Sequence, residues 1–104
     1  MDIQFHGHQA ELTDGIRLTA SEGIQKLIEH LGRPVDADVW VSEDGVKKTV
    51  EVVLHAPHCD KLVGKSEGKY HEPALTDAIA KLDAQIRRLK TAKKKQVHEA
   101  ELRA

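Results

Sequence analysis

Apolar residues recur along the chain with two periods, one typical of helices and one typical of strands. Between residues 13 and 32 they lie three or four positions apart, which predicts an amphipathic helix. Thr13 suits the N-cap of this helix, and Gly32 followed by Pro34 suits its end. The stripe consists of Ile16, Ala20, Ile24, Leu27, Ile28 and Leu31. Gly23 also lies inside this helix, although glycine lowers helix stability. Its presence therefore indicates that another element packs closely against the helix there.

Alternation of apolar and polar residues predicts four strands. A short strand covers residues 2–6. Residues 37–42 and 49–55 alternate in the same way on the two sides of the turn signal Glu43-Asp44-Gly45, which predicts a hairpin. A weaker fourth strand covers residues 61–67.

A second helix is predicted to open at Glu72-Pro73, because proline is favoured at the first helical position. Its apolar stripe consists of Leu75, Ile79, Leu82, Ile86 and Leu89. The next position in the series is Lys93, so the buried stripe ends there. Residues 93–104 are expected to form a solvated helical extension or a disordered tail. We assign the domain to residues 1–95 and a polar C-terminal tail to residues 96–104.

The resulting order, β-α-β-β-β-α, predicts one α+β domain. Its first three elements imply a crossover that places the first helix on one face of the sheet. The second helix then returns to that face, which gives a four-stranded sheet with two helices packed on one side. The other face is expected to remain open to water, consistent with Thr49, Glu51 and His55. A chain of 104 residues fits a single domain.

Charge is nearly balanced overall but unevenly distributed. The chain has 16 Lys or Arg against 17 Asp or Glu, yet residues 81–95 hold seven Lys or Arg and one Asp. The chain has no apolar run of the roughly 20 residues that a membrane span requires, and no signal segment. A single cysteine excludes an internal disulfide framework and fits a reducing compartment. We therefore expect a cytoplasmic protein without a membrane partner.

The basic stretch falls on two neighbouring faces of the second helix. One face carries Lys81, Gln85, Arg88 and Lys95, and the next carries Arg87, Lys90 and Lys94. A single acid within the stretch cannot neutralise so many cations by i to i+4 pairing, so the pattern favours binding of a polyanion, RNA above all. The alternative is a helix whose charges serve only solubility.

Other chemistry finds less support in the sequence. The segments His6-Gly-His8 and His55-Ala-Pro-His58-Cys59 have spacings that a transition-metal site could use, but CxxC and HExxH patterns are absent. Cys59 lacks a nucleophile signature, and no catalytic or phosphate-loop motif occurs. Trp40 either stacks on a base from the open sheet face or is an ordinary, partly buried residue. We predict no enzyme activity, no cofactor, no metal and no small-molecule substrate.

Short fragments spread over most of the chain match one family in order and spacing. They are Gly7, Glu11-Leu12-Thr13-Asp14, Ile16-Arg17, Lys26-Leu27, Ser66-Glu67-Gly68, Lys81-Leu82, Gln85-Ile86, Arg88 and Lys90. With these residues the chain resembles the short form of the ribosome hibernation promoting factors, also called ribosome-associated inhibitors or sigma-54 modulation proteins. The resemblance implies a double-stranded-RNA-binding-like fold. It also implies a factor that binds 16S rRNA in the decoding region of the small ribosomal subunit and blocks mRNA and tRNA binding during stress or stationary phase.

The resemblance further implies which residues contact rRNA. They are Arg17, Lys26, Lys81, Arg88 and Lys90, with Gln85 as a hydrogen-bonding companion and Lys93, Lys94 and Lys95 as a basic extension. The chain departs from the family at Gly23, where a lysine is common, and at residues 70–76 before and into the last helix. Without the dimerisation domain of long members, we expect a monomer off the ribosome. The alternative function is an RNA- or protein-binding module of the same fold that acts off the ribosome.

Overall fold

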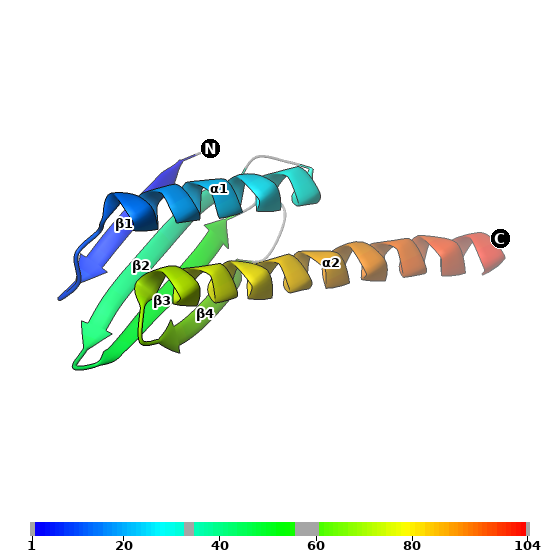
Figure 1. Ribbon diagram of the computed structural model, residues 1–104. Helices are drawn as coiled ribbons and strands as arrows, with labels where there is room; N and C mark the ends of the chain where they lie inside the picture. Colours follow the sequence, from blue (N-terminus) through cyan, green and yellow to red (C-terminus); the bar gives the residue numbers. More distant parts are fainter. Residues whose placement is uncertain (1, 33–34, 56–60, 104) are drawn as a thin grey trace.

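The chain folds into a four-stranded sheet with two helices on one of its faces (Figure 1). The structure, a computed structural model, describes residues 2–32, 35–55 and 61–103, with side chains as far as Arg88. The elements are β1 (Ile3–His8), α1 (Asp14–Leu31), β2 (Asp36–Asp44), β3 (Lys47–His55), β4 (Leu62–Gly68) and α2 (His71–Arg103). The predicted element order and fold class are confirmed.

The strands lie in the sheet in their sequence order. β1 pairs parallel with β2 across the α1 crossover, and β2, β3 and β4 pair antiparallel. β1 is longer than predicted, because its pairing with β2 continues through Gly7 and His8. The β2–β3 hairpin closes through Gly45-Val46, and Gly45 has a φ of 64°, which glycine adopts without steric cost. β1 and β4 are therefore the two edge strands.

The ends of α1 lie where the sequence predicts. The Thr13 side-chain oxygen accepts a hydrogen bond from the Ile16 backbone N–H at 3.2 Å, which satisfies one of the free donors of the first turn. Gly32 ends the helix with a φ of 78°, and its N–H donates to the Ile28 carbonyl at 2.9 Å. α2 begins at His71, earlier than predicted. Pro73 still lies in the first turn, where its missing N–H loses no helical hydrogen bond.

The core lies between the sheet and the two helices. Its largest fully buried side chains are Ile24, Leu27, Val39, Val41, Val50, Val52, Leu54, Leu75, Leu82 and Ile86. Two glycines let the backbones approach closely. A Cβ at Gly23 would clash with Ile79, which confirms the close helix packing predicted there, and a Cβ at Gly64 would clash with the Ala78 carbonyl oxygen. In the described ranges, neither helix combines the length and the apolar character needed to cross a membrane.

The contact between β4 and α2 can be tested at Gly64. Gly64→Ala would place a methyl group against the Ala78 carbonyl and 2.9 Å from Leu82 Cγ, and a helix backbone cannot move away cheaply. We expect a loss of about 1–3 kcal/mol in the free energy of unfolding, measured by urea denaturation.

Gly68→Ala is the matched control on the same strand. A Cβ there meets no atom within 4 Å, so the change should be close to neutral. Equal stability of the two variants would contradict the close approach of α2 to β4.

Candidate nucleic-acid interface

α2 holds the basic stretch in place by packing its apolar stripe on the sheet. Leu75, Leu82 and Ile86 are fully buried, so the side chains on the other faces of the helix are fixed in direction. α2 then continues past the end of the sheet, where its C-terminal part projects away from the rest of the molecule (Figure 1). Lys90, Lys93, Lys94 and Lys95 lie in that projecting part, beyond the described side chains.

Lys81 and Gln85 lie together beside β4. The Lys81 ammonium donates a hydrogen bond to the Lys65 carbonyl oxygen at 2.8 Å, and the Gln85 amide nitrogen donates to the Val63 carbonyl oxygen at 2.8 Å. These carbonyls belong to an edge strand, whose unpaired polar groups need partners. Both side chains therefore have a structural role at the sheet edge that the sequence analysis missed.

Acidic residues neutralise more of the basic stretch than the sequence analysis allowed. Asp77, four residues before Lys81, lies 3.4 Å from its ammonium, and Asp83 lies 3.0 Å from the Arg87 guanidinium. Asp77 precedes the basic stretch of residues 81–95, but the helical turn brings it beside Lys81. The Ser66 hydroxyl donates to Asp77 at 2.6 Å, and this hydrogen bond, with a smaller contribution from Lys81, lowers the pKa of Asp77.

Arg88 differs from these two cations. It is exposed and, among the side chains that the structure describes, forms no ion pair. It lies one turn before Ala92 and the lysine run at 93–95, so it is the first cation of the projecting basic segment. Its guanidinium can therefore present its planar fork to a phosphate.

The two cations of α1 lie apart from that segment. The Arg17 guanidinium carbon sits 5.0 Å from the centre of the Phe5 ring, in cation–π contact with β1. Because β1 and β4 are opposite edges of the sheet, Arg17 and Lys81 do not belong to one compact site. Lys26 instead points toward the groove between α1 and α2.

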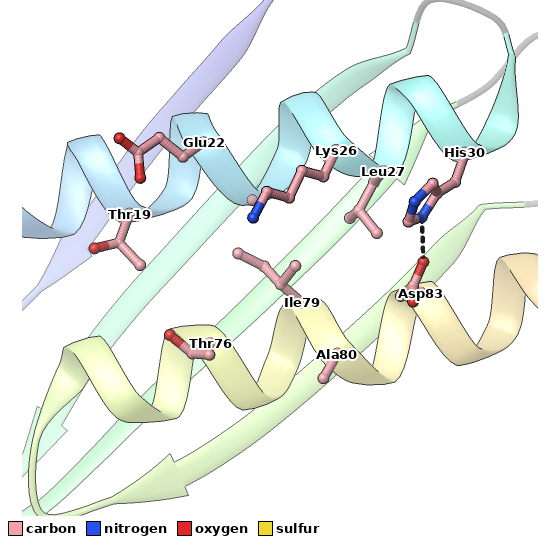
Figure 2. A pocket seen from close by; sticks show the side chains of 10 residues that line it. Thr19, Glu22, Lys26, Leu27, His30, Thr76, Ile79, Ala80 and Asp83 are labelled. Atoms are coloured by element: carbon pink, nitrogen blue, oxygen red, sulfur yellow. Dashed lines mark hydrogen bonds and ion pairs between the residues drawn. The ribbon is translucent and has the colours of Figure 1, made fainter.

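That groove has a volume of about 340 Å³ and lies between the facing sides of the two helices (Figure 2). Its floor is largely apolar, with Leu27 and Ile79 at its centre. At one end the His30 ring lies 2.7 Å from the Asp83 carboxylate, which ties α1 to α2. Asp83 thus contacts both His30 and Arg87, which links α1 to this one cation of α2.

The open sheet face carries a histidine–carboxylate cluster that sequence spacing alone did not reveal. Asp38 lies between two imidazoles, at 2.9 Å from His6 Nε2 and 3.0 Å from His55 Nε2. No group of three or more His, Cys, Asp or Glu in the described ranges is arranged to hold a metal ion. His58 and Cys59, which the sequence analysis considered as ligands, lie outside those ranges. Trp40 is 47% exposed and stacks on the His6 ring.

Comparison with known proteins decides the family. A family model described as sigma 54 modulation protein / S30EA ribosomal protein matches residues 3–94. The chain belongs to this family. This result confirms the resemblance to sigma-54 modulation proteins that the sequence fragments indicated.

Relatives and solved structures agree with this assignment. The chain is 28% identical over 86 residues to a ribosome hibernation promoting factor of Azotobacter vinelandii, covering 83% of this chain and 79% of the relative. The N-terminal domain of Thermus thermophilus Protein Y superposes with a TM-score of 0.77 at 24% identity, over 86% of this chain and 99% of that one. A ribosomal subunit interface protein of Coxiella burnetii gives 0.74 at 16% identity, over 88% and 99%. At these identities, the two structural matches support the fold of this sigma-54 modulation family member.

The role of Gln85 at the sheet edge predicts an effect on stability. Gln85→Ala removes the donor to the Val63 carbonyl, so we expect a loss of about 0.5–1.5 kcal/mol in the free energy of unfolding. The measurement is thermal or urea denaturation of the purified chain.

Arg88→Ala is the control three residues along the same helix, where no such bond is lost, and it should change stability by less than about 0.5 kcal/mol. If Gln85→Ala were as stable as the control, the hydrogen bond from Gln85 to the edge strand β4 would not contribute to stability, and the proposed role would be wrong.

Proposed function

We propose that the chain is a ribosome-associated hibernation factor, acting in the cytoplasm without catalysis. Its target is 16S rRNA in the decoding region of the small ribosomal subunit, and its bound form blocks mRNA and tRNA during stress or stationary phase. The observation that carries the proposal is the family match over residues 3–94. The names of its relatives, a ribosome hibernation promoting factor and a ribosomal subunit interface protein, point to the same place of action.

The physical basis of binding is a rigid helix that carries cations past the edge of the domain. Arg88 begins this set, and Lys90, Lys93, Lys94 and Lys95 continue it along α2. Phosphate contacts of this kind supply affinity and orientation without reading sequence, so the protein depends on the shape of its rRNA channel for specificity. Lys26 adds a cation from α1 at the groove between the helices.

Lys81, Gln85 and Arg17 take a smaller part in this proposal. An ammonium group has three donors, and Lys81 already directs two toward the Lys65 carbonyl and Asp77. The Gln85 amide nitrogen serves Val63, and the Arg17 guanidinium covers Phe5. Each can contact rRNA only with the donors that remain. We therefore assign most of the binding energy to Lys26, Arg88 and the lysines that follow.

An RNA- or protein-binding module acting off the ribosome remains the alternative. It differs from the main proposal in one measurable respect, because such a module would not co-sediment with small subunits. The first experiment therefore separates the two.

Binding to purified small subunits should fall steeply with salt. If Lys26, Arg88, Lys90 and Lys93–Lys95 each neutralise one phosphate, the slope of log K against log salt is about −4 to −5. Raising salt from 50 to 200 mM then weakens binding by about 250- to 1,000-fold. Co-sedimentation at several salt concentrations measures this slope. Absence of co-sedimentation at the lowest salt would refute the proposal.

The site assignment predicts a change in that slope. The double variant Lys26→Ala with Arg88→Ala removes two proposed phosphate contacts, so the slope should become shallower by about 1.5. Circular dichroism checks that the variant is folded.

Lys47→Ala is the matched control. Lys47 lies on the open sheet face and pairs with Glu67 at 2.9 Å, so its removal should leave the slope unchanged. Equal slopes for the double variant and the control would place the RNA contact elsewhere.

A further inference from the structure

The face of the sheet that the helices leave uncovered is acidic, opposite in sign to the C-terminal half of α2. Strand register fixes which side chains point to this face, because residues two apart along a strand share a side. Its strand residues include five carboxylates and two lysines: Asp36, Asp38, Asp44, Glu51, Glu67, Lys47 and Lys65. Lys47 is already paired with Glu67. A phosphate backbone is therefore repelled here, and a cationic partner is attracted.

An exposed indole lies at the centre of this acidic face. The Trp40 ring stacks on His6 with centroids 3.9 Å apart and planes within 15°. Even so, Trp40 remains 47% exposed, far more than an aromatic residue that only packs a core. The His6 ring also hydrogen-bonds Asp38, so the indole is held in a fixed orientation rather than left loose on the surface.

Two carboxylates flank the indole. Glu51 on β3 is the direct cross-strand neighbour of Trp40, and Asp38 lies two residues before it on the same side of β2. Directly opposed residues have Cβ atoms about 5 Å apart. Lys65 on β4 is the other cross-strand neighbour of Glu51, but among the described residues the two form no ion pair, so the Glu51 carboxylate keeps acceptors for a partner. The hydrogen bond from His6 lowers the pKa of the Asp38 carboxyl, and the hydrogen bond from His55 adds a smaller effect in the same direction. Asp38 is therefore kept ionised.

An aromatic ring with carboxylates at its sides is the arrangement that binds cationic side chains, since the ring face and the carboxylates attract the same positive charge. We propose that the open sheet face docks a basic polypeptide segment, with an arginine side chain on Trp40 and its guanidinium facing Glu51 and Asp38. This is a protein-binding surface on the side of the molecule away from the helices. It is independent of the rRNA contact proposed for α2.

The chain provides its own reporter, because Trp40 is its single tryptophan. The experiment titrates isotope-labelled protein with a hexa-arginine peptide and follows the Trp40 indole N–H signal by NMR. We expect a saturable shift of this signal, and no shift with a hexa-citrulline peptide, which has the same shape without charge. An indole signal that hexa-arginine leaves unmoved would overturn the proposal, as would a larger shift with a single-stranded RNA hexamer.

Variants test the two parts of the surface separately, by fluorescence anisotropy of a labelled hexa-arginine peptide. Trp40→Leu should weaken binding by about two- to thirtyfold, the range that one cation–π contact supplies. Glu51→Gln should also weaken it, by at least about twofold. Glu22→Gln makes the same change of charge on α1, in the other layer, and should leave affinity within twofold. Equal effects of Glu51→Gln and Glu22→Gln would show attraction to net charge alone and would contradict the proposed surface.

These measurements use no ribosome. A negative result would therefore leave the proposed rRNA contact of α2 standing, and a failure of small-subunit binding would leave this surface standing.

Discussion

The packing of α2 on the sheet determines the positions of most other functional side chains. Leu75, Leu82 and Ile86 are fully buried against it, and Gly64 lets β4 come close to the helix backbone. This contact fixes the rotation of α2 about its axis. That rotation decides which polar side chains turn toward β4, which turn toward α1, and which remain free. In the sequence the apolar stripe of α2 ends before Lys93, while the helix itself continues to Arg103.

One consequence is a separation of charge within a chain whose net formal charge is only −1. Five carboxylates lie on the open sheet face, and residues 87–95 of α2 hold six Lys or Arg and no acid. Ion pairs with Asp77 and Asp83 neutralise the part of α2 that lies on the sheet. Near-neutral overall charge is therefore compatible with strong local attraction for a polyanion, and it limits nonspecific association elsewhere on the surface.

The sequence predicts most of the fold because local patterns determine it. The helical stripe from Ile16 to Leu31, the Thr13 cap and the Gly45 turn each depend on residues close in the chain, and all appear in the structure. The site is harder to predict, because its contacts join distant segments. Lys81 and Gln85 have the composition of an RNA-binding stripe, yet their partners are β4 carbonyls that no helical pattern reveals.

The histidine cluster shows the same limit. His6 and His55 are far apart in sequence, and only the register of β1 and β3 on β2 brings both to Asp38. A strand shifted by one residue would turn one imidazole into the core. The side of the sheet that Trp40 faces does follow from local pattern, because it alternates along β2 with the buried Ala37, Val39 and Val41.

A cryo-EM structure of the chain bound to the small ribosomal subunit would show which face of the molecule contacts rRNA. We expect the projecting half of α2, from Arg88 onward, to lie against 16S rRNA phosphates while the open sheet face with Trp40 points away from RNA. A complex with the sheet face packed on rRNA and the α2 cations in solvent would contradict this expectation.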